Sequence, residues 1–126
     1  MAVSKWLGAL PDTASFPLGL FGASTGAAAA LQTAAALPNK IKTVVSRGGR
    51  PDLAGQKALT QVQCPTLLIV GGYDDVVIEL NQQADALLTC LKELVIVPGA
   101  THLFEEPGTL EQVARVAAAW FRKYLT

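Results

Sequence analysis

The sequence alternates four times between short apolar runs and longer segments with helical patterning. The run at residues 66–70 is apolar almost throughout, as expected of a strand that is buried on both faces. Such alternation predicts an α/β domain with a parallel sheet of about four strands, right-handed crossovers and helices on both faces. Ligands of such sheets bind beyond the carboxyl ends of the strands, so the residues that follow each strand are the first candidates for chemistry.

The boundaries of the elements follow from apolar periodicity and from the positions of Pro and Gly. Strands are expected at residues 18–21, 41–46, 66–70 and 94–97. Helices are expected at residues 3–10, 25–37, 54–62, 77–91 and 110–124.

The length of 126 residues and the hydrophobic content of 51% suit one domain with its own core. Ten basic and ten acidic residues cancel, and no basic cluster predicts a nucleic-acid partner. Cys64 and Cys90 have no second Cys or His at ligand spacing, so we expect no metal site and no cofactor. The two thiols are interpreted as reduced core residues of a cytoplasmic protein.

Residues 13–39 contain no charged side chain, and Gly22 and Gly26 have the spacing of membrane-helix dimers. A single membrane-spanning helix is therefore an alternative for this segment. Several Pro and Gly residues interrupt its first half, its second half is mostly Ala, and no basic cluster or aromatic belt flanks it in the usual way. No signal peptide is visible at the start of the sequence. We expect neither a membrane span nor a membrane partner.

The sequence Gly22-Ala23-Ser24-Thr25-Gly26 follows the first expected strand directly and precedes a helix. This is the setting of a nucleophile turn, in which a strained backbone exposes the serine hydroxyl beside a helix amino terminus. The glycines on either side prevent clashes between the strand and the helix. The alternative is an ordinary glycine-rich turn between a strand and a helix.

A serine nucleophile requires a base and a carboxylate that orients the base. His102 is the one histidine of the chain and follows the fourth expected strand, although a lone histidine is often incidental. Asp74 and Asp75 follow the third strand, and the order Ser, Asp, His is the order found in α/β-hydrolases. We favour Asp74 as the acid because Asp75 falls where it can cap the next helix.

Four segments resemble those of dienelactone-hydrolase-like serine hydrolases of the α/β-hydrolase superfamily. They are residues 20–28 (LFGASTGAA), 45–53 (VSRGGRPDL), 68–74 (LIVGGYD) and 98–106 (PGATHLFEE). The resemblance implies Ser24 as nucleophile, Asp74 as triad acid and His102 as base. Dienelactone hydrolases proper have a cysteine in place of Ser24, so the resemblance implies a general small-molecule carboxylic ester as substrate. Similar bacterial domains occur alone and fused to phosphoribosyltransferases.

The family fold has about eight strands, of which this chain supplies the last four, so we expect a single truncated domain. The resemblance implies one oxyanion donor in the backbone N–H of Thr25 and a second donor outside this chain. Loss of that donor implies weak activity, and a silent domain that acts through association is the alternative. The strand from Leu18 to Phe21 would form an exposed apolar edge, which predicts a homodimer through this strand or a complementing partner.

Arg47 and Arg50 follow the second strand and can face the same edge of the sheet as Ser24. A guanidinium there would bind an acidic group of a substrate, which makes Arg47 a candidate substrate-binding residue. The alternative is that both arginines pair with Asp52 or with solvent.

Overall fold

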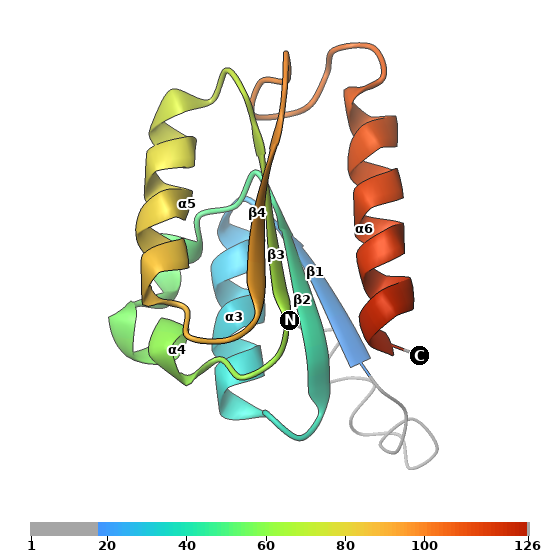
Figure 1. Cartoon of the computed structure of the whole chain (residues 1–126). Helices are drawn as coiled ribbons and strands as arrows, with labels where there is room; N and C mark the ends of the chain where they lie inside the picture. Colours follow the sequence, from blue (N-terminus) through green and yellow to red (C-terminus); the bar gives the residue numbers. More distant parts are fainter. Residues whose placement is uncertain (1–17, 126) are drawn as a thin grey trace.

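The computed structural model describes residues 18–125, which contain one four-stranded sheet. The strands are β1 (Leu18–Ala23), β2 (Ile41–Arg47), β3 (Thr66–Gly71) and β4 (Lys92–Val97). They lie in the order β1-β2-β3-β4, and each neighbouring pair is parallel (Figure 1). The predicted α/β architecture is confirmed, and the helix expected at residues 3–10 lies outside the described residues.

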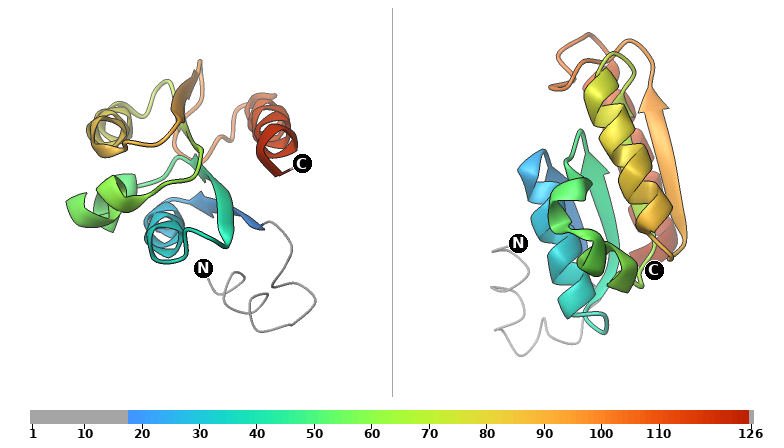
Figure 2. Two further views of the ribbon diagram at one scale, coloured as in Figure 1. Left: turned by 60° about the horizontal axis from the view of Figure 1, so that its bottom comes forward. Right: turned by 90° about the vertical axis from the view of Figure 1, so that its left-hand side faces the viewer.

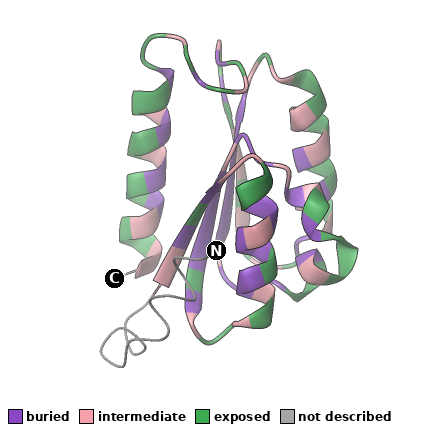
Figure 3. Ribbon diagram, turned by 180° about the vertical axis from the view of Figure 1, so that it is seen from behind, coloured by how far each residue is buried: buried purple, intermediate pink, exposed green. Residues whose placement is uncertain are grey.

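Helices cover both faces of the sheet, as expected (Figure 2). The helices α3 (Thr25–Ala36), α4 (Gln56–Gln61) and α5 (Asp75–Leu87) pack on one face, together with a 3-10 turn at Pro51–Ala54. The helix α6 (Thr109–Leu125) packs on the opposite face. Each face has its own hydrophobic cluster, and every residue of β3 is buried between the two clusters (Figure 3).

The segment considered as a membrane span folds as β1 followed by α3. Three buried alanines of α3 and Leu31 belong to the cluster on this face of the sheet, since small side chains let a helix approach it closely. Among residues 18–125, no helix combines the length and the apolar character that crossing a bilayer requires.

Two helices differ from the expected boundaries by more than one residue. The helix expected at residues 54–62 is α4, which begins at Gln56 because Gly55, with φ of 92°, separates it from the 3-10 turn that precedes it. The helix expected at residues 77–91 is α5, which begins at Asp75 and ends at Leu87. The chain becomes extended at Leu88 so that β4 can begin at Lys92, two residues before the expected position.

The strand β1 lies at one edge of the described sheet, and Phe21 in it is 50% exposed. This is the placement on which the homodimer prediction depends. The pairing of β1 with a second copy of the chain stays a prediction.

A buried chain of hydrogen bonds ties α6 to the sheet. The indole N–H of Trp120 donates to Thr43 Oγ1 over 2.7 Å, and this hydroxyl donates to the carbonyl of Pro65 over 2.6 Å. Thr43 has no exposed surface, so water cannot replace either partner.

Thr43→Val preserves the shape of the side chain but removes both hydrogen bonds. We expect the free energy of unfolding to fall by about 1–3 kcal/mol, because the indole N–H and the Pro65 carbonyl remain buried without partners. Urea denaturation followed by circular dichroism measures the change. Thr60→Val is the matched control, since the Thr60 hydroxyl bonds a backbone carbonyl at an exposed position and its loss should change stability by less than about 0.5 kcal/mol.

Candidate active site

Ser24 is the single residue between the end of β1 and the start of α3. Its backbone has φ of 52° and ψ of −124°, a region that residues with a side chain rarely adopt. Such a conformation costs about 1–3 kcal/mol and persists only where the surrounding structure enforces it. The strained turn expected at Ser24 is therefore present.

The two glycines that flank Ser24 have different roles. A Cβ on Gly22 would lie 2.6 Å from the carbonyl oxygen of Gly26 and 2.7 Å from the Ala27 backbone. A Cβ on Gly26 would meet no described atom within 4 Å. The close crossing of β1 and α3 thus requires a glycine only at position 22. The prediction that Gly26 also prevents a clash is wrong.

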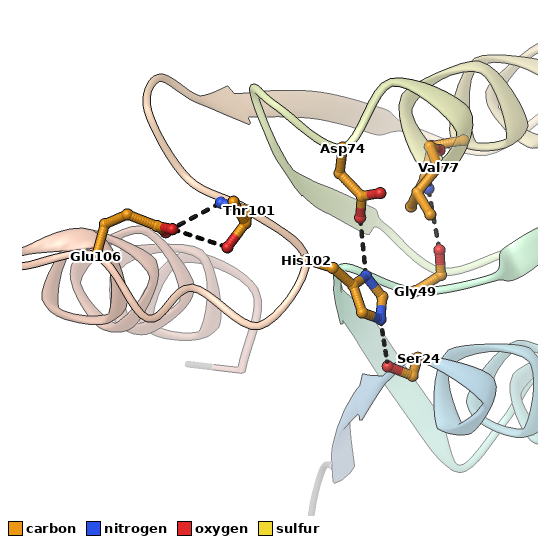
Figure 4. A network of polar contacts seen from close by, with 8 residues as sticks. Ser24, Gly49, Asp74, Val77, Thr101, His102 and Glu106 are labelled. Atoms are coloured by element: carbon orange, nitrogen blue, oxygen red, sulfur yellow. Dashed lines mark hydrogen bonds and ion pairs between the residues drawn. The ribbon is translucent and has the colours of Figure 1, made fainter.

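Ser24, His102 and Asp74 converge in one chain of hydrogen bonds (Figure 4). Ser24 Oγ lies 3.1 Å from His102 Nε2, and His102 Nδ1 lies 2.8 Å from Asp74 Oδ2. An ionised carboxylate only accepts hydrogen bonds, so the proton of a neutral imidazole is on Nδ1 and Nε2 accepts from the serine hydroxyl. The side chain of His102 is 39% exposed and that of Asp74 is 16% exposed, which leaves the histidine open to a ligand.

Asp74 and His102 are held together because the loops after β3 and β4 are joined through their backbones. The N–H of Gly72 donates to the carbonyl of Val97 over 2.8 Å. The N–H of Tyr73 donates to the carbonyl of Ala100 over 3.0 Å. A Cβ on Gly71 would lie 2.4 Å from the Ala100 oxygen, so only glycine permits this approach. Asp75, the alternative acid, is the first residue of α5 and does not contact His102 in the described hydrogen bonds.

The loop after β2 supports the serine turn. The N–H of Arg50 donates to the carbonyl of Ser24 over 3.0 Å, and the amide of Asn81 donates to the carbonyl of Gly49 over 3.0 Å. Asn81 is fully buried and also donates to the carbonyl of Val77. The sequence reasoning missed Asn81, although its place in line with Val77 and Ala84 on the buried side of α5 identifies a polar residue at a core position.

Glu106 fastens the loop that carries His102. Its carboxylate accepts from the Thr101 N–H over 3.0 Å and from the Thr101 hydroxyl over 2.8 Å (Figure 4). The hydrogen bond from the Thr101 N–H is the largest cause that lowers the pKa of Glu106 below its usual value. Glu106 thus stabilises the conformation of the loop that carries His102.

The two arginines after β2 behave differently. Arg50 forms two hydrogen bonds of 3.0 Å to the carboxylate of Asp52, as the alternative interpretation expected. The guanidinium of Arg47 instead lies 5.6 Å from the centre of the Phe104 ring. Arg47 Nε is buried without a hydrogen-bond acceptor among the described residues. Arg47 therefore lies beside Phe104, in the loop of His102, without an ion pair to a carboxylate of the described residues.

Thr25 is the first residue of α3, so its backbone N–H has no partner within the helix. An N–H at this position, at the positive end of the helix dipole, can stabilise a negative oxygen beside Ser24. The arrangement combines a hydroxyl, an imidazole that accepts its proton, and a carboxylate that orients the imidazole. Chemically, it is suited to nucleophilic attack on an acyl carbon.

Comparison with solved structures places this geometry in a known fold. A dienelactone hydrolase from Anabaena variabilis superposes with a TM-score of 0.92 and is 55% identical, over 98% of this chain and 56% of that chain. The chain has the α/β-hydrolase fold. The esterase domain of a Rhodothermus marinus protein shares this fold, with a TM-score of 0.84 at 22% identity over 99% of this chain and 68% of that chain.

Curated relatives of this α/β-hydrolase domain are longer proteins. Two proteins of Mycobacterium tuberculosis strains, provisionally named as phosphoribosyl transferases, are each 62% identical over 123 residues. The match covers 98% of this chain and 28% of each relative. The chain thus spans just over a quarter of their length. No protein-family model matches the sequence.

Gly22→Ala should lower the free energy of unfolding by about 1–3 kcal/mol, because the added methyl group would collide with backbone that cannot move away easily. Gly26→Ala is the matched control and should leave stability unchanged or slightly raised, since alanine is the better helix former and the position is open. Denaturant titration of the two variants distinguishes them. Equal destabilisation by both changes would contradict the asymmetry of the turn.

Proposed function

We propose that this domain is a serine hydrolase of small carboxylic esters. The observation that carries the proposal is the hydrogen-bonded chain from Ser24 through His102 to Asp74. The similarity to a dienelactone hydrolase at 55% identity supports a hydrolase, and the serine at position 24 favours an ester that forms an acyl-enzyme.

In the proposed reaction, His102 Nε2 accepts the proton of the Ser24 hydroxyl as Ser24 Oγ attacks the ester carbonyl. The carbonyl oxygen becomes an oxyanion, to which the Thr25 N–H donates. The imidazolium, stabilised by Asp74, then gives its proton to the departing alcohol and leaves an acyl-enzyme. A water molecule that gives up a proton to His102 attacks the acyl group, and the acid departs as Ser24 regains its proton.

A second candidate is a catalytically weak or silent domain that functions through association. The support for this candidate is that, among residues 18–125, the resemblance assigns one oxyanion donor, the backbone N–H of Thr25. The second oxyanion donor that the resemblance implies is also expected outside this chain. One missing donor typically lowers the rate by about 10²–10³-fold.

A fluorophosphonate probe should label Ser24 in the folded 126-residue chain, and Ser24→Ala should abolish both labelling and turnover of p-nitrophenyl acetate. Asp74→Asn should slow both reactions by roughly 10³–10⁴-fold, because the amide no longer holds the productive imidazole tautomer. Asp75→Asn is the matched control and should have little effect. A folded chain, judged by circular dichroism, whose Ser24 stays unlabelled would support the silent domain instead.

We further propose that Arg47 binds an anionic group on the acyl part of the substrate. The support is the position of its guanidinium beside Phe104, in the loop region of His102, without an ion pair to a carboxylate of the described residues. The guanidinium of the neighbouring Arg50 forms an ion pair with Asp52 and is therefore not free to bind a substrate anion.

Arg47→Gln should raise KM for p-nitrophenyl hemisuccinate by about 10- to 150-fold, which corresponds to the 1.5–3 kcal/mol of a charged hydrogen bond. The neutral p-nitrophenyl butyrate, of equal chain length, should change little. Arg50→Gln is the control and should affect both esters alike. Equal effects of Arg47→Gln on the two esters would argue against an anion site.

A further inference from the structure

The two cysteines of the chain lie in bends that precede the neighbouring strands β3 and β4 by the same number of residues. Cys64 is two residues before Thr66, Cys90 is two residues before Lys92, and Thr66 pairs with Lys92 at the start of the β3–β4 ladder. The N–H of Thr66 donates to the carbonyl of Leu91 over 2.9 Å, so the two segments remain side by side just before the ladder. Paired parallel strands are about 4.8 Å apart, so segments that lie side by side at the start of such a pair approach the Cα separation of about 4.4–6.8 Å that a disulfide requires.

Both thiols also lie on the same face of the sheet. Cys64 is a buried member of the cluster under α3, α4 and α5, and Cys90 packs against that cluster. The hydroxyl of Thr66 links the two cysteine residues, because Cys90 Sγ is 3.7 Å from Thr66 Oγ1 and this hydroxyl donates to the backbone carbonyl of Cys64 over 3.1 Å. Both thiols are free in this structure.

The two cysteines differ in their access to solvent. Cys90 lines a surface hollow of about 670 Å³ together with Gln61, Gln63 and Thr89. Cys64 is 8% exposed, and burial, followed by the charge of nearby Cys90, raises the pKa of its thiol to about 11. A small oxidant in the hollow therefore meets Cys90 first.

We propose that Cys64 and Cys90 form a site of reversible covalent modification, in which a peroxide converts the pair into an intramolecular disulfide. The Cys90 sulfur attacks one oxygen of hydrogen peroxide, the O–O bond breaks, and Cys90 sulfenic acid and water result. The Cys64 sulfur then attacks the Cys90 sulfur, the S–O bond breaks, and a second water leaves. Two thiols lose two electrons and two protons, and one peroxide is reduced to two waters.

The bond would join the chain just before β3 to the chain just before β4, at the end of the sheet opposite to Ser24, His102 and Asp74. It would enclose residues 65–89, which include the turn that carries Asp74. A cross-link of this length restricts the unfolded chain, so oxidation should raise the melting temperature. The site depends only on the fold and is independent of the proposed ester hydrolysis.

The test treats the reduced 126-residue chain with hydrogen peroxide, removes the excess with catalase, and alkylates the remaining thiols in denaturant. We expect both thiols to become protected together, with the mass of two hydrogens lost and both thiols restored by dithiothreitol. Trypsin leaves both cysteines on one peptide, since residues 58–91 contain no Lys or Arg. Cleavage after Glu79 places them on separate peptides, which should remain joined until reduction.

Two variants test the order of the steps. Cys64→Ser should leave Cys90 to accumulate as a sulfenic acid that dimedone traps, and Cys90→Ser should leave Cys64 unmodified. Loss of Cys90 alone in the wild-type chain, with Cys64 still open to alkylation in denaturant, would overturn the proposal. Disulfides found only between two chains in dilute solution would overturn it as well.

Discussion

The close crossing of β1 and α3 at Gly22 is the constraint on which the position of Ser24, and with it the candidate site, depends. Because Gly22 has no side chain, the first turn of α3 lies against the strand, and Ser24 is forced into a backbone conformation with positive φ. In that conformation, Ser24 forms the sharp turn between the end of β1 and the start of α3. The loop after β2 then holds the turn through the bond from the Arg50 N–H to the Ser24 carbonyl.

The parallel sheet brings the other two residues of the candidate triad, Asp74 and His102, to the same edge as Ser24. Asp74 follows β3 and His102 follows β4, and the two loops meet where the backbones of Gly71 and Ala100 approach each other. The acid and the base are therefore placed by backbone hydrogen bonds rather than by their own side chains alone. Such rigid support favours a preorganised site over one that assembles when a ligand binds.

Similarity to known proteins shows the fold, and the reaction is argued from the site. At 55% identity the dienelactone hydrolase supports the hydrolase proposal, whereas the mycobacterial relatives carry a name that describes proteins more than three times as long as the match. A fold alone does not determine a function, which depends on the chemistry of the site. The geometry of Ser24, His102 and Asp74 is for this reason the stronger argument.

The α/β class, the four strands and the three residues of the candidate triad could be predicted from the sequence, because apolar periodicity and the order Ser, Asp, His are local or linear features. It did not reveal that Gly26 is sterically free, that Asn81 anchors the loop after β2, or that Glu106 fastens the loop of His102. These points depend on atoms that packing between distant segments brings together. Sequence spacing can mark a polar residue at a core position, as it does for Asn81, but it does not specify which atoms meet there.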